Sequence, residues 1–510
     1  MGTLYTKTMP RHEREISMYI KSIIDILNKD YNTNISASYY SEISKWQKWW
    51  EGFASFHRVR ELQENGGYVS RRLYSMKMAK KVCEDWASVL LNEKTKIVID
   101  DKNSTDFVQG EDGTGGVFGS IEFWEEANSL VEKAFYSGTG AFVLKLDKLK
   151  VMKNGNVTVS PDAEIRMEYL PAFCIIPLTR RYKRITEAAF VSENTVKGKQ
   201  FIYLEIHTLE KGMYVIENRY YKVSSSNKLE VAELPEGIAP RFVTGSPKPF
   251  FYIIRPNIVN PYKNNLGLGC SVYSEAIDNL MGVDLAFNNF CRDFKLGGKK
   301  VFYNRELTKQ SGVTADGSPL YITPDDMMQQ LFVSIGDEWA DDKKMVHEFN
   351  PSLRVEENKD GVQAQLDYLS FKCGLGAKHY RFGADSRGAV VTATQYAGDK
   401  QELKQYASKH GIAIEKALQD LVRIILWVGK NFLKKDINPD ANIKVEFSDG
   451  YIISDEEKRN DDREDVASGI MQIWEYRMRW YSEDEETAKA NAVTLGPTYG
   501  TNTFTSGEDE

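Results

Sequence analysis

The sequence has few cysteines and no long apolar run, and both absences exclude classes of protein. Its five cysteines are scattered and never form a C-x-x-C pair: Cys83, Cys174, Cys270, Cys291 and Cys373. This spacing argues against a disulfide framework and a cysteine zinc site, and it favours a reducing compartment. No apolar stretch is long enough to span a membrane, and the first 29 residues do not resemble a signal peptide. We therefore expect a soluble intracellular protein without membrane contact.

Positive charge is not in excess either. The chain carries 66 lysines and arginines against 73 aspartates and glutamates, a net charge of -7. This is the wrong sign for a protein that grips nucleic acid through its phosphates over its whole surface. The 510 residues, 42% of them hydrophobic, are enough for a sizeable core and roughly two to four domains.

Motifs for catalysis and cofactor binding are also missing. The six histidines never form an H-x-x-x-H pair. The glycine-rich residues 110–116 lack a Walker lysine and favour a flexible loop, and Gly267-x-Gly269 lacks the third glycine of a dinucleotide fingerprint. His207 lies in an alternating strand pattern, where a structural or surface role is favoured over a metal ligand. The consecutive acids of residues 337–342 favour a solvated loop over a paired-carboxylate site. We expect no enzyme activity, no metal and no cofactor.

The most informative stretch is residues 257–303, where a proline- and glycine-containing approach leads into a helical pattern. One face of this helix is apolar at steps of three, four or seven, and it holds Tyr273, Ile277, Leu280, Phe287, Phe290 and Phe294. The other face is acidic, with Glu275, Asp278, Asp284 and Asp293 against only Arg292 and Lys295. Ser271 is the predicted N-cap, and Gly297-Gly298 the predicted end.

The residues before this stretch change once, from a helical to an alternating apolar pattern. Apolar periodicity predicts helices around residues 16–27, 39–53, 76–90 and 121–135, with a strand at 96–99. After Gly138-Thr139-Gly140 the pattern alternates, which predicts a strand from residue 141 and a hairpin of residues 201–207 and 213–223 around Lys211-Gly212.

The helix within residues 257–303 is followed by an insert, residues 299–352, in which short strands are predicted at 300–303 and 320–323. A second helix is predicted at 361–373, then a basic and aromatic loop, then a long helix over 392–428 that Gly398 and Gly411 could kink. A strand at 443–447, a helix from a capping box at Ser454 to about residue 478, another helix from 482 and a disordered tail at 496–510 complete the chain. The expected fold is α+β and mainly helical. Two helices that leave and re-enter the body with a module at their far end suggest a stalk and assembly into a closed ring.

Several of these segments resemble the portal proteins of tailed bacteriophages, in the branch found in long-tailed phages of Gram-positive hosts. The resemblance is carried by residues 267–302, by Gly374-Leu375-Gly376 through Thr392-Ala393-Thr394-Gln395, by residues 78–87 and by residues 138–141. It covers roughly residues 76–492. The family has glutamate where this chain has Gln395, so a hydrogen bond would have to replace any ion pair that this acid makes in relatives.

The resemblance implies a dodecameric ring at one capsid vertex of the virion, assembled in the host cytoplasm. The ring would be the channel for double-stranded DNA packaging and ejection, docking the terminase large subunit and then the head-tail adaptor protein, with major capsid and scaffolding proteins as further partners. The implied regions are a wing (1–256, and 392–453 with the long helix), a stem (257–298 and 357–376), a clip (299–356), a tunnel loop (377–391) and a crown (454–495). Because the chain lacks a Walker A motif, the packaging ATPase is expected to be a separate partner.

The same resemblance implies two sets of functional residues. The acidic stem would line the channel and repel phosphates, through Glu275, Asp278, Asp284 and Asp293. The tunnel loop would touch DNA weakly, through Lys378, His379, Tyr380, Arg381 and Arg387; a merely solvated loop is the alternative. Two other functions stay open at this point: a non-channel scaffold or adaptor that binds other virion proteins, and a nucleic-acid-processing enzyme.

Overall fold

The structure is a computed structural model that describes most of the chain. The described residues are 11–62, 66–92, 94–111, 113–148, 150–151, 157–158, 163–182, 184–224, 228–235, 238–304, 310–313, 315–317, 319–321, 332–335, 346–383, 393–447, 455–481 and 483–493. The chain divides into two compact units, Met1–Val391 with Gln401–Phe447 and Thr392–Lys400 with Ser448–Glu510. The predicted tail, residues 496–510, lies outside the described residues.

The helices predicted in the first third are present. They are α1 (Arg11–Tyr31), α2 (Ser38–Glu51), α3 (Met78–Leu90) and α6 (Phe123–Ser137). Trp46 and Trp86 are fully buried and form the centre of this layer. Helix α2 ends where Gly52 adopts φ +74°, and its N–H caps the carbonyls of Lys48 and Trp49. The sequence did not predict α4 (Lys102–Gln109) and α5 (Gly116–Ser120), nor the hairpin of β1 (Arg58–Leu62) and β2 (Tyr68–Arg72).

Two sheets fill the middle of the large unit. The larger has the order β12-β11-β10-β9-β8, with β13 beside β11, and the smaller has the order β14-β4-β7. Their bounds are β4 Gly140–Asp147, β7 Glu164–Pro171, β8 Ile175–Arg181, β9 Arg184–Val196, β10 Lys199–Glu210, β11 Met213–Val223, β12 Leu229–Ala232, β13 Arg241–Val243 and β14 Phe251–Ile254. Phe190 of β9 meets Phe251 of β14 edge to face at 5.2 Å, so the sheets pack against each other. The chain combines these strands with its helices, so the α+β expectation is confirmed, while the finer expectation of a mainly helical fold is not.

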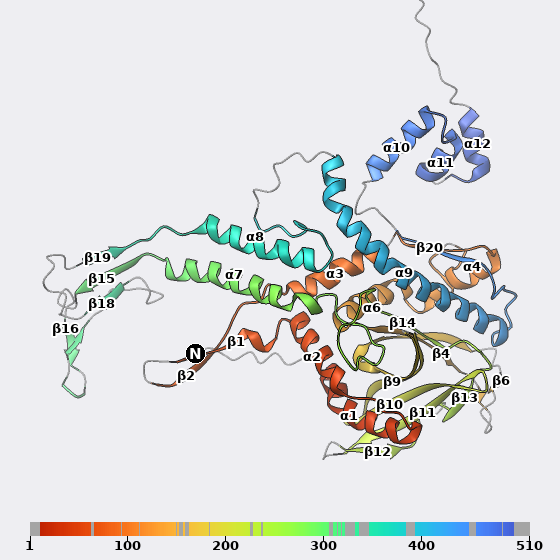
Figure 1. Cartoon of the computed structure of the whole chain (residues 1–510), viewed down its shortest axis with the longest axis horizontal. Coiled ribbons are helices and arrows are strands. Elements are labelled where there is room, and N and C mark those ends of the chain that lie inside the picture. The colour runs from red at the N-terminus through yellow and green to blue at the C-terminus, as the bar shows by residue number, and fades with distance from the viewer. Residues whose placement is uncertain are drawn as a thin grey trace, which may run out of the picture. The chain divides into compact units, whose positions relative to one another are not determined.

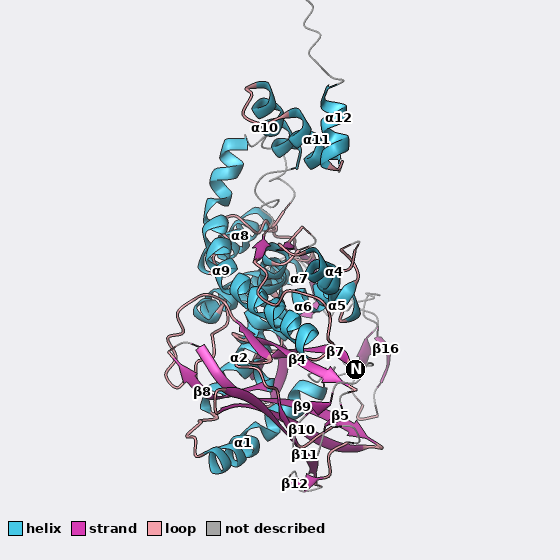
Figure 2. Cartoon of the chain, turned by 90° about the vertical axis from the view of Figure 1, so that its right-hand side faces the viewer, coloured by secondary structure: helices cyan, strands magenta, loops and turns pink. Residues whose placement is uncertain are grey.

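The predicted hairpin is confirmed in detail. Glu210 pairs with Met213 across Lys211 and Gly212, which both have positive φ (+49° and +85°). Two such residues make the tight turn that matches the twist of the strands. The hydroxyl of Tyr31, at the end of α1, donates to Glu217 of β11 (2.7 Å), so α1 lies against this sheet (Figure 2).

Helix α9 (Ala393–Asn431) is the predicted long helix, and neither Gly398 nor Gly411 interrupts it. Its buried residues from Ile414 to Val428 contribute to the core of the large unit. After it, β20 (Ile443–Glu446) pairs with β3 (Lys96–Ile99), as the two predicted strands allow. Short β5 (Lys150–Val151) and β6 (Val157–Thr158) pair with each other. Among the described residues, no helix has the length and apolar character needed to cross a membrane.

The small unit contains α10 (Asp455–Ala467), α11 (Ile473–Tyr481) and α12 (Glu485–Val493). The sequence predicted one helix as far as residue 478, and that prediction is wrong. The chain turns at Gly469, whose φ is +78° and whose N–H donates to the carbonyl of Val466. The carboxylate of Asp462 then accepts a hydrogen bond from the indole of Trp480 (2.6 Å), which holds α10 against α11.

Candidate functional site

The two helices predicted to flank an insert form one continuous feature of the large unit (Figure 1). Helix α7 (Ile277–Leu296) leads outward into β15 (Lys300–Asn304), and β19 (Val346–Phe349) leads back into α8 (Val355–Lys372). β15 and β19 pair antiparallel, with Lys300 opposite Phe349, so the helix pair continues as a strand pair. We call α7, α8, β15 and β19 together the stalk.

The insert carried by the stalk is partly described. Strand β18 (Phe332–Ile335) pairs parallel with β15, and β16 (Gln310–Val313) pairs with β17 (Pro319–Tyr321). These strands confirm that the insert is built of short strands. The acidic cluster predicted at residues 337–342 lies outside the described residues.

The helix boundaries differ from the prediction at both starts. Ser271 is fully buried rather than an N-cap, and a short 3-10 turn, Ser274–Ala276, precedes α7. Tyr273 lies before the helix, where its hydroxyl donates to the carbonyl of Trp46 (2.8 Å). Helix α8 begins at Val355, not at Gly361. The start of α7 is therefore set by the tertiary contacts of the buried residues that precede it, such as Tyr273, and not by a local capping signal.

The two helices of the stalk approach each other at Gly282 of α7, where a larger residue would require the flexible side chain of Gln365 to move. A Cβ at Gly282 of α7 would collide with the side-chain oxygen of Gln365 in α8. At the outer end, Asp293 of α7 accepts hydrogen bonds from Arg354 (2.8 Å) and Asn358 (3.0 Å) at the start of α8. The hydrogen bond from Arg354 lowers the pKa of Asp293. The pair is therefore joined along its length by close packing and by polar bonds.

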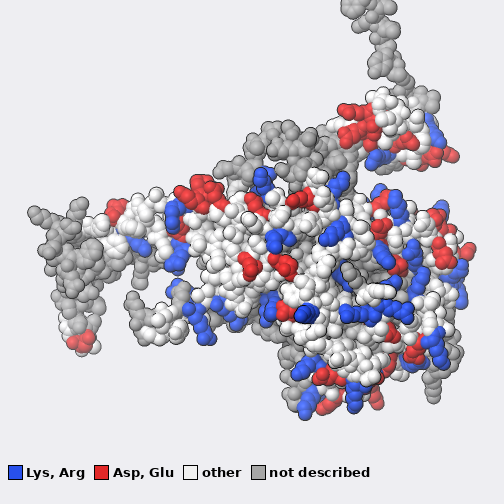
Figure 3. Space-filling model, viewed as in Figure 1, with Lys and Arg blue, Asp and Glu red and all other residues white. Residues whose placement is uncertain are grey.

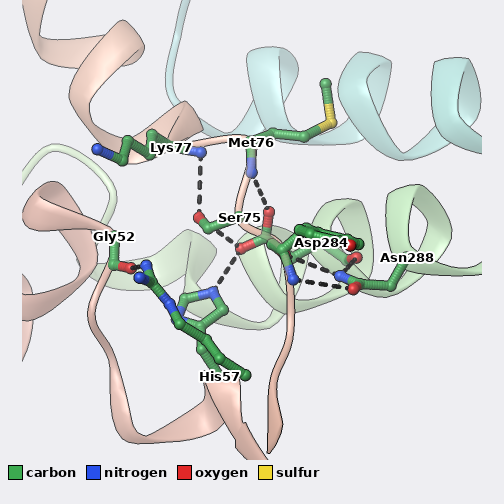
Figure 4. A network of polar contacts seen from close by, with 9 residues as sticks. Gly52, His57, Ser75, Met76, Lys77, Asp284 and Asn288 are labelled. Carbon is green, nitrogen blue, oxygen red and sulfur yellow. Dashed lines mark hydrogen bonds and ion pairs between the residues drawn. The ribbon is translucent and has the colours of Figure 1, made fainter. Parts of the chain in front are cut away.

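Asp284 joins the stalk to the helical layer (Figure 4). Its carboxylate is 4% exposed, and it is bonded to Nε2 of His57 (2.8 Å), the hydroxyl of Ser75 (3.1 Å) and the backbone N–H of Met76 (2.8 Å). One turn later, Asn288 donates to the carbonyl of Tyr74 and accepts from its N–H. The expectation that Asp284 lines a channel is therefore wrong, because its charge is enclosed within the subunit.

The other three acids of the predicted set, of which Glu275 lies in the 3-10 turn before α7, have different surroundings. Glu275 and Asp278 are exposed, while Asp293 is only 20% exposed and paired with Arg354. That these three face a channel stays a prediction. His57 and Ser75, which hold Asp284, were missed by the sequence reasoning because nothing near them in the sequence signals a partner more than 200 residues away.

The loop after α8 is attached to the stalk at its beginning. The side chain of Gln363 donates to the carbonyl of Tyr380 (2.8 Å) and accepts from the N–H of Phe382 (2.7 Å). The ring of His379 lies 3.4 Å from the carboxylate of Asp85 in α3. Burial raises the pKa of Asp85, but hydrogen bonds from His379 and Lys81 outweigh it, so the net pKa is lowered.

Tyr380 is buried at 8% exposure, and burial followed by the charge of Asp85 raises the pKa of its hydroxyl. The prediction that Tyr380 contacts DNA is therefore wrong for this arrangement, since its side chain packs inside the subunit. Lys378 and Arg381 are exposed, and His379 is partly exposed. Arg387 lies outside the described residues.

The largest polar cluster described away from the stalk lines a cavity between the two sheets. A cavity of about 580 Å³ is lined by strands of both sheets and contains Lys145, Glu168 and Glu205. Lys145 pairs with both glutamates (2.6 and 3.1 Å), and His207 bonds Glu205 (2.7 Å). Burial raises the pKa of Glu205, but Lys145 and His207 outweigh it and lower the value to about 2. His207 is fully buried, as its predicted structural role requires. Within the described part of the chain, no group of three or more histidines, cysteines or acids could hold a metal ion.

Comparison with protein families decides the general role. The model for the family described as phage portal protein, SPP1 Gp6-like, matches residues 21–471. The chain belongs to this family. A comparison with curated proteins found no match.

Membership gives the chain a portal role in DNA packaging and places it in the bacteriophage virion. The role of the portal family is structural rather than catalytic. The match begins within α1, earlier than the resemblance seen in the sequence, and it includes both sheets, the whole stalk and α9. It ends at residue 471, so α11 and α12 of this portal protein lie beyond it.

Proposed function

We propose that this portal protein forms a dodecameric ring at one capsid vertex and that the ring is the channel for double-stranded DNA during packaging and ejection. The observation that carries the proposal is the stalk, which leaves the large unit and returns to it with the insert at its outer end. Its attachment by Asp284 and the bonds of Asp293 with Arg354 and Asn358 make it a stiff projection. A stiff projection repeated by rotation would make the wall of a tube.

The exposed apolar side chains of the stalk support side-by-side assembly. Leu285, Phe294 and Leu296 of α7 are 45–48% exposed, and Tyr368 and Phe371 of α8 are 67% and 52% exposed. Large apolar side chains that stay exposed on one projecting feature are candidates for an interaction site. In a ring, each stalk would cover these side chains with the stalks of its neighbours.

The charges of the site fit a conduit that does not hold its cargo. Glu275 and Asp278 would line the channel and repel phosphates, with Asp293 contributing less because Arg354 neutralises it. Lys378 and Arg381 of the tunnel loop would touch the DNA backbone weakly, together with Arg387 and His379. Residues 299–356, which comprise the insert together with strands β15 and β19 that lead to it, are the proposed docking site for the terminase large subunit and then for the head-tail adaptor protein.

Imaging of the purified protein tests this proposal. We expect rings with a central hole in negative-stain micrographs, and a particle mass close to twelve chains by native mass spectrometry. A particle without a hole would favour a scaffold or adaptor. A strictly monomeric mass over a range of salt and protein concentrations would contradict the ring.

A further inference from the structure

The hairpin of β1 and β2 projects from the large unit beside α7 (Figure 1). The strands pair from Arg58 opposite Arg72 to Leu62 opposite Tyr68, and no third strand joins them in the described residues. Leu62 and Tyr68 are 67% and 71% exposed. An isolated two-stranded hairpin is marginally stable in water and needs a surface to pack on.

The root of this hairpin is nevertheless held firmly. Arg72 donates to the carbonyl of Gly52 (2.7 Å), and the N–H of Leu73 donates to the carbonyl of His57 (2.8 Å). His57 and Tyr74, which flank the hairpin, are bonded to Asp284 and Asn288 of α7. The direction of the hairpin is thus fixed by the stalk while its two strands stay uncovered, as expected of an arm that meets a partner in a set position.

One face of the arm combines positive charge with an apolar end. Residues two apart on a strand, and residues opposite each other on a pair, point to the same face. This places Arg58, Arg60 and Leu62 together, with Tyr68 opposite Leu62. Arg58 and Arg60 are exposed. A complementary surface would be acidic over one part and apolar over the next.

The start of α8 carries acidic and apolar side chains next to each other, and its two cations, Arg354 and Lys359, are already paired with Asp293 and Glu356. Glu357 and Asp360 are exposed, and just before them the exposed apolar side chains are Leu353 (40%) and Phe349 (45%). Figure 1 draws the hairpin and α8 on opposite sides of α7, and in Figure 3 the basic residues around the hairpin are well separated from the acidic residues at the start of α8. Two different surfaces on opposite sides of one chain make a head-to-tail contact, which generates a ring when the rotation from one copy to the next closes.

The two surfaces are also at the same level along the stalk. Gly282 of α7 faces Gln365, and Asp293 faces Arg354 and Asn358. Asn288, which holds the hairpin root, is therefore level with about residues 359–363 of α8. The arm extends about 17 Å beyond its root at ~3.4 Å per residue. In a ring whose axis runs along the stalk, the arginines of one copy come level with Glu357 and Asp360 of the next.

We propose that the β1–β2 hairpin docks on the start of α8 in the neighbouring copy of this chain. Arg58 and Arg60 pair with Glu357 and Asp360, and Leu62 and Tyr68 cover Leu353 and Phe349. This inference rests on the proposed ring and names one contact that holds it together. The apolar tip argues for a protein surface and against the phosphate backbone of DNA as the partner.

Charge reversal on each side, followed by reversal on both, tests the contact. The variant Arg58→Glu/Arg60→Glu and the variant Glu357→Arg/Asp360→Arg should each weaken subunit association at least about 10-fold, because like charges then face each other. The variant with all four changes should assemble as the unchanged protein does. Lys197→Glu/Lys199→Glu, on the exposed turn between β9 and β10, is the matched control and should have no effect. Mass photometry over a dilution series gives the association, and thermal unfolding of the dissociated chain checks the fold.

A photo-crosslinking amino acid at Leu62, in rings mixed from unlabelled and ¹⁵N-labelled chains, tests the partner directly. We expect adducts between differently labelled chains that map to residues 346–361. Adducts confined to the same chain, to another surface or to added duplex DNA would overturn the inference, as would single-sided variants that assemble normally. If the unchanged protein forms no ring at all, the proposed function fails as well; if it forms rings that charge reversal does not disturb, only this contact is refuted.

Discussion

At the scale of single residues, Asp284 shows how a charge can be structural. Its carboxylate binds His57, Ser75 and the backbone of Met76 while almost fully buried. Asp284→Ala would leave these groups buried without an acceptor, and we expect a loss of about 2–4 kcal/mol in the free energy of unfolding. Denaturant unfolding at a concentration where the chain is dissociated measures it. Asp278→Ala, on the same helix but exposed, should change stability by less than about 0.5 kcal/mol. Equal effects of the two changes would contradict the structural role.

His410 of α9 predicts a pH dependence. Its ring packs edge-on against Trp86 and Phe135, and its Nδ1 accepts a hydrogen bond from the N–H of Asn257 (2.9 Å). Burial, and then the charge of Lys409, lowers its pKa to about 3. Between pH 6.5 and 3 the unfolded chain therefore binds this proton more strongly than the folded chain. The contribution of His410 to stability is complete above pH 6.5 and decreases as the pH falls.

From pH 7 to pH 5 this residue should remove roughly 2 kcal/mol of stability, at about 1.4 kcal/mol per pH unit below the unfolded pKa. The unfolding free energy of His410→Gln should therefore fall by that much less over the same range. His347→Gln is a suitable control, because His347 is exposed on β19. Parallel pH profiles for His410→Gln and the unchanged protein would refute the assignment.

At the scale of elements, helices and strands with a regular apolar period could be predicted from the sequence, and elements without such a period could not. The hairpin of β10 and β11 and the helix pair with its insert followed from local period and from glycine, because apolar burial and turn geometry act over a few residues. Helix α10 was extended too far because it is almost uniformly polar and has no apolar face whose end could be seen. The β1–β2 hairpin was missed because its strands are rich in arginine and mostly exposed.

The errors at the candidate site have the same origin. Asp278 and Asp284 are both acids of α7, yet only Asp284 meets His57, which is 227 positions away in the sequence. Tyr380 occupies a loop with cations, yet it packs inward beside α3 rather than outward. Periodicity assigns a face to a helical residue, but the fold decides what covers that face. The sequence could therefore supply candidates for the residues of the proposed channel. The structure was needed to show that Asp284 and Tyr380 are buried within the subunit.

At the scale of the whole molecule, the proposed conduit for DNA would have to balance repulsion with light contact. The chain is net negative at -7, and Lys378 and Arg381 are the exposed cations of the described part of the tunnel loop. We expect the variant Lys378→Gln/Arg381→Gln/Arg387→Gln to assemble into rings as before, while the amount of nuclease-protected DNA in packaging reactions changes. Each phosphate contact that is lost should lower the salt sensitivity of DNA contact by about one unit of slope.

The matched control for this variant is Lys197→Gln/Lys199→Gln/Lys211→Gln, which removes the same number of exposed charges from the turns of the large sheet. If the control changes packaging as much as the loop variant does, the effect comes from net charge and not from the loop. If the loop variant packages and retains DNA normally at every salt concentration, the loop cations do not touch DNA. If the amount of packaged DNA changes only in the loop variant and its rings still assemble, the loop cations contact DNA although the net charge of the protein repels it.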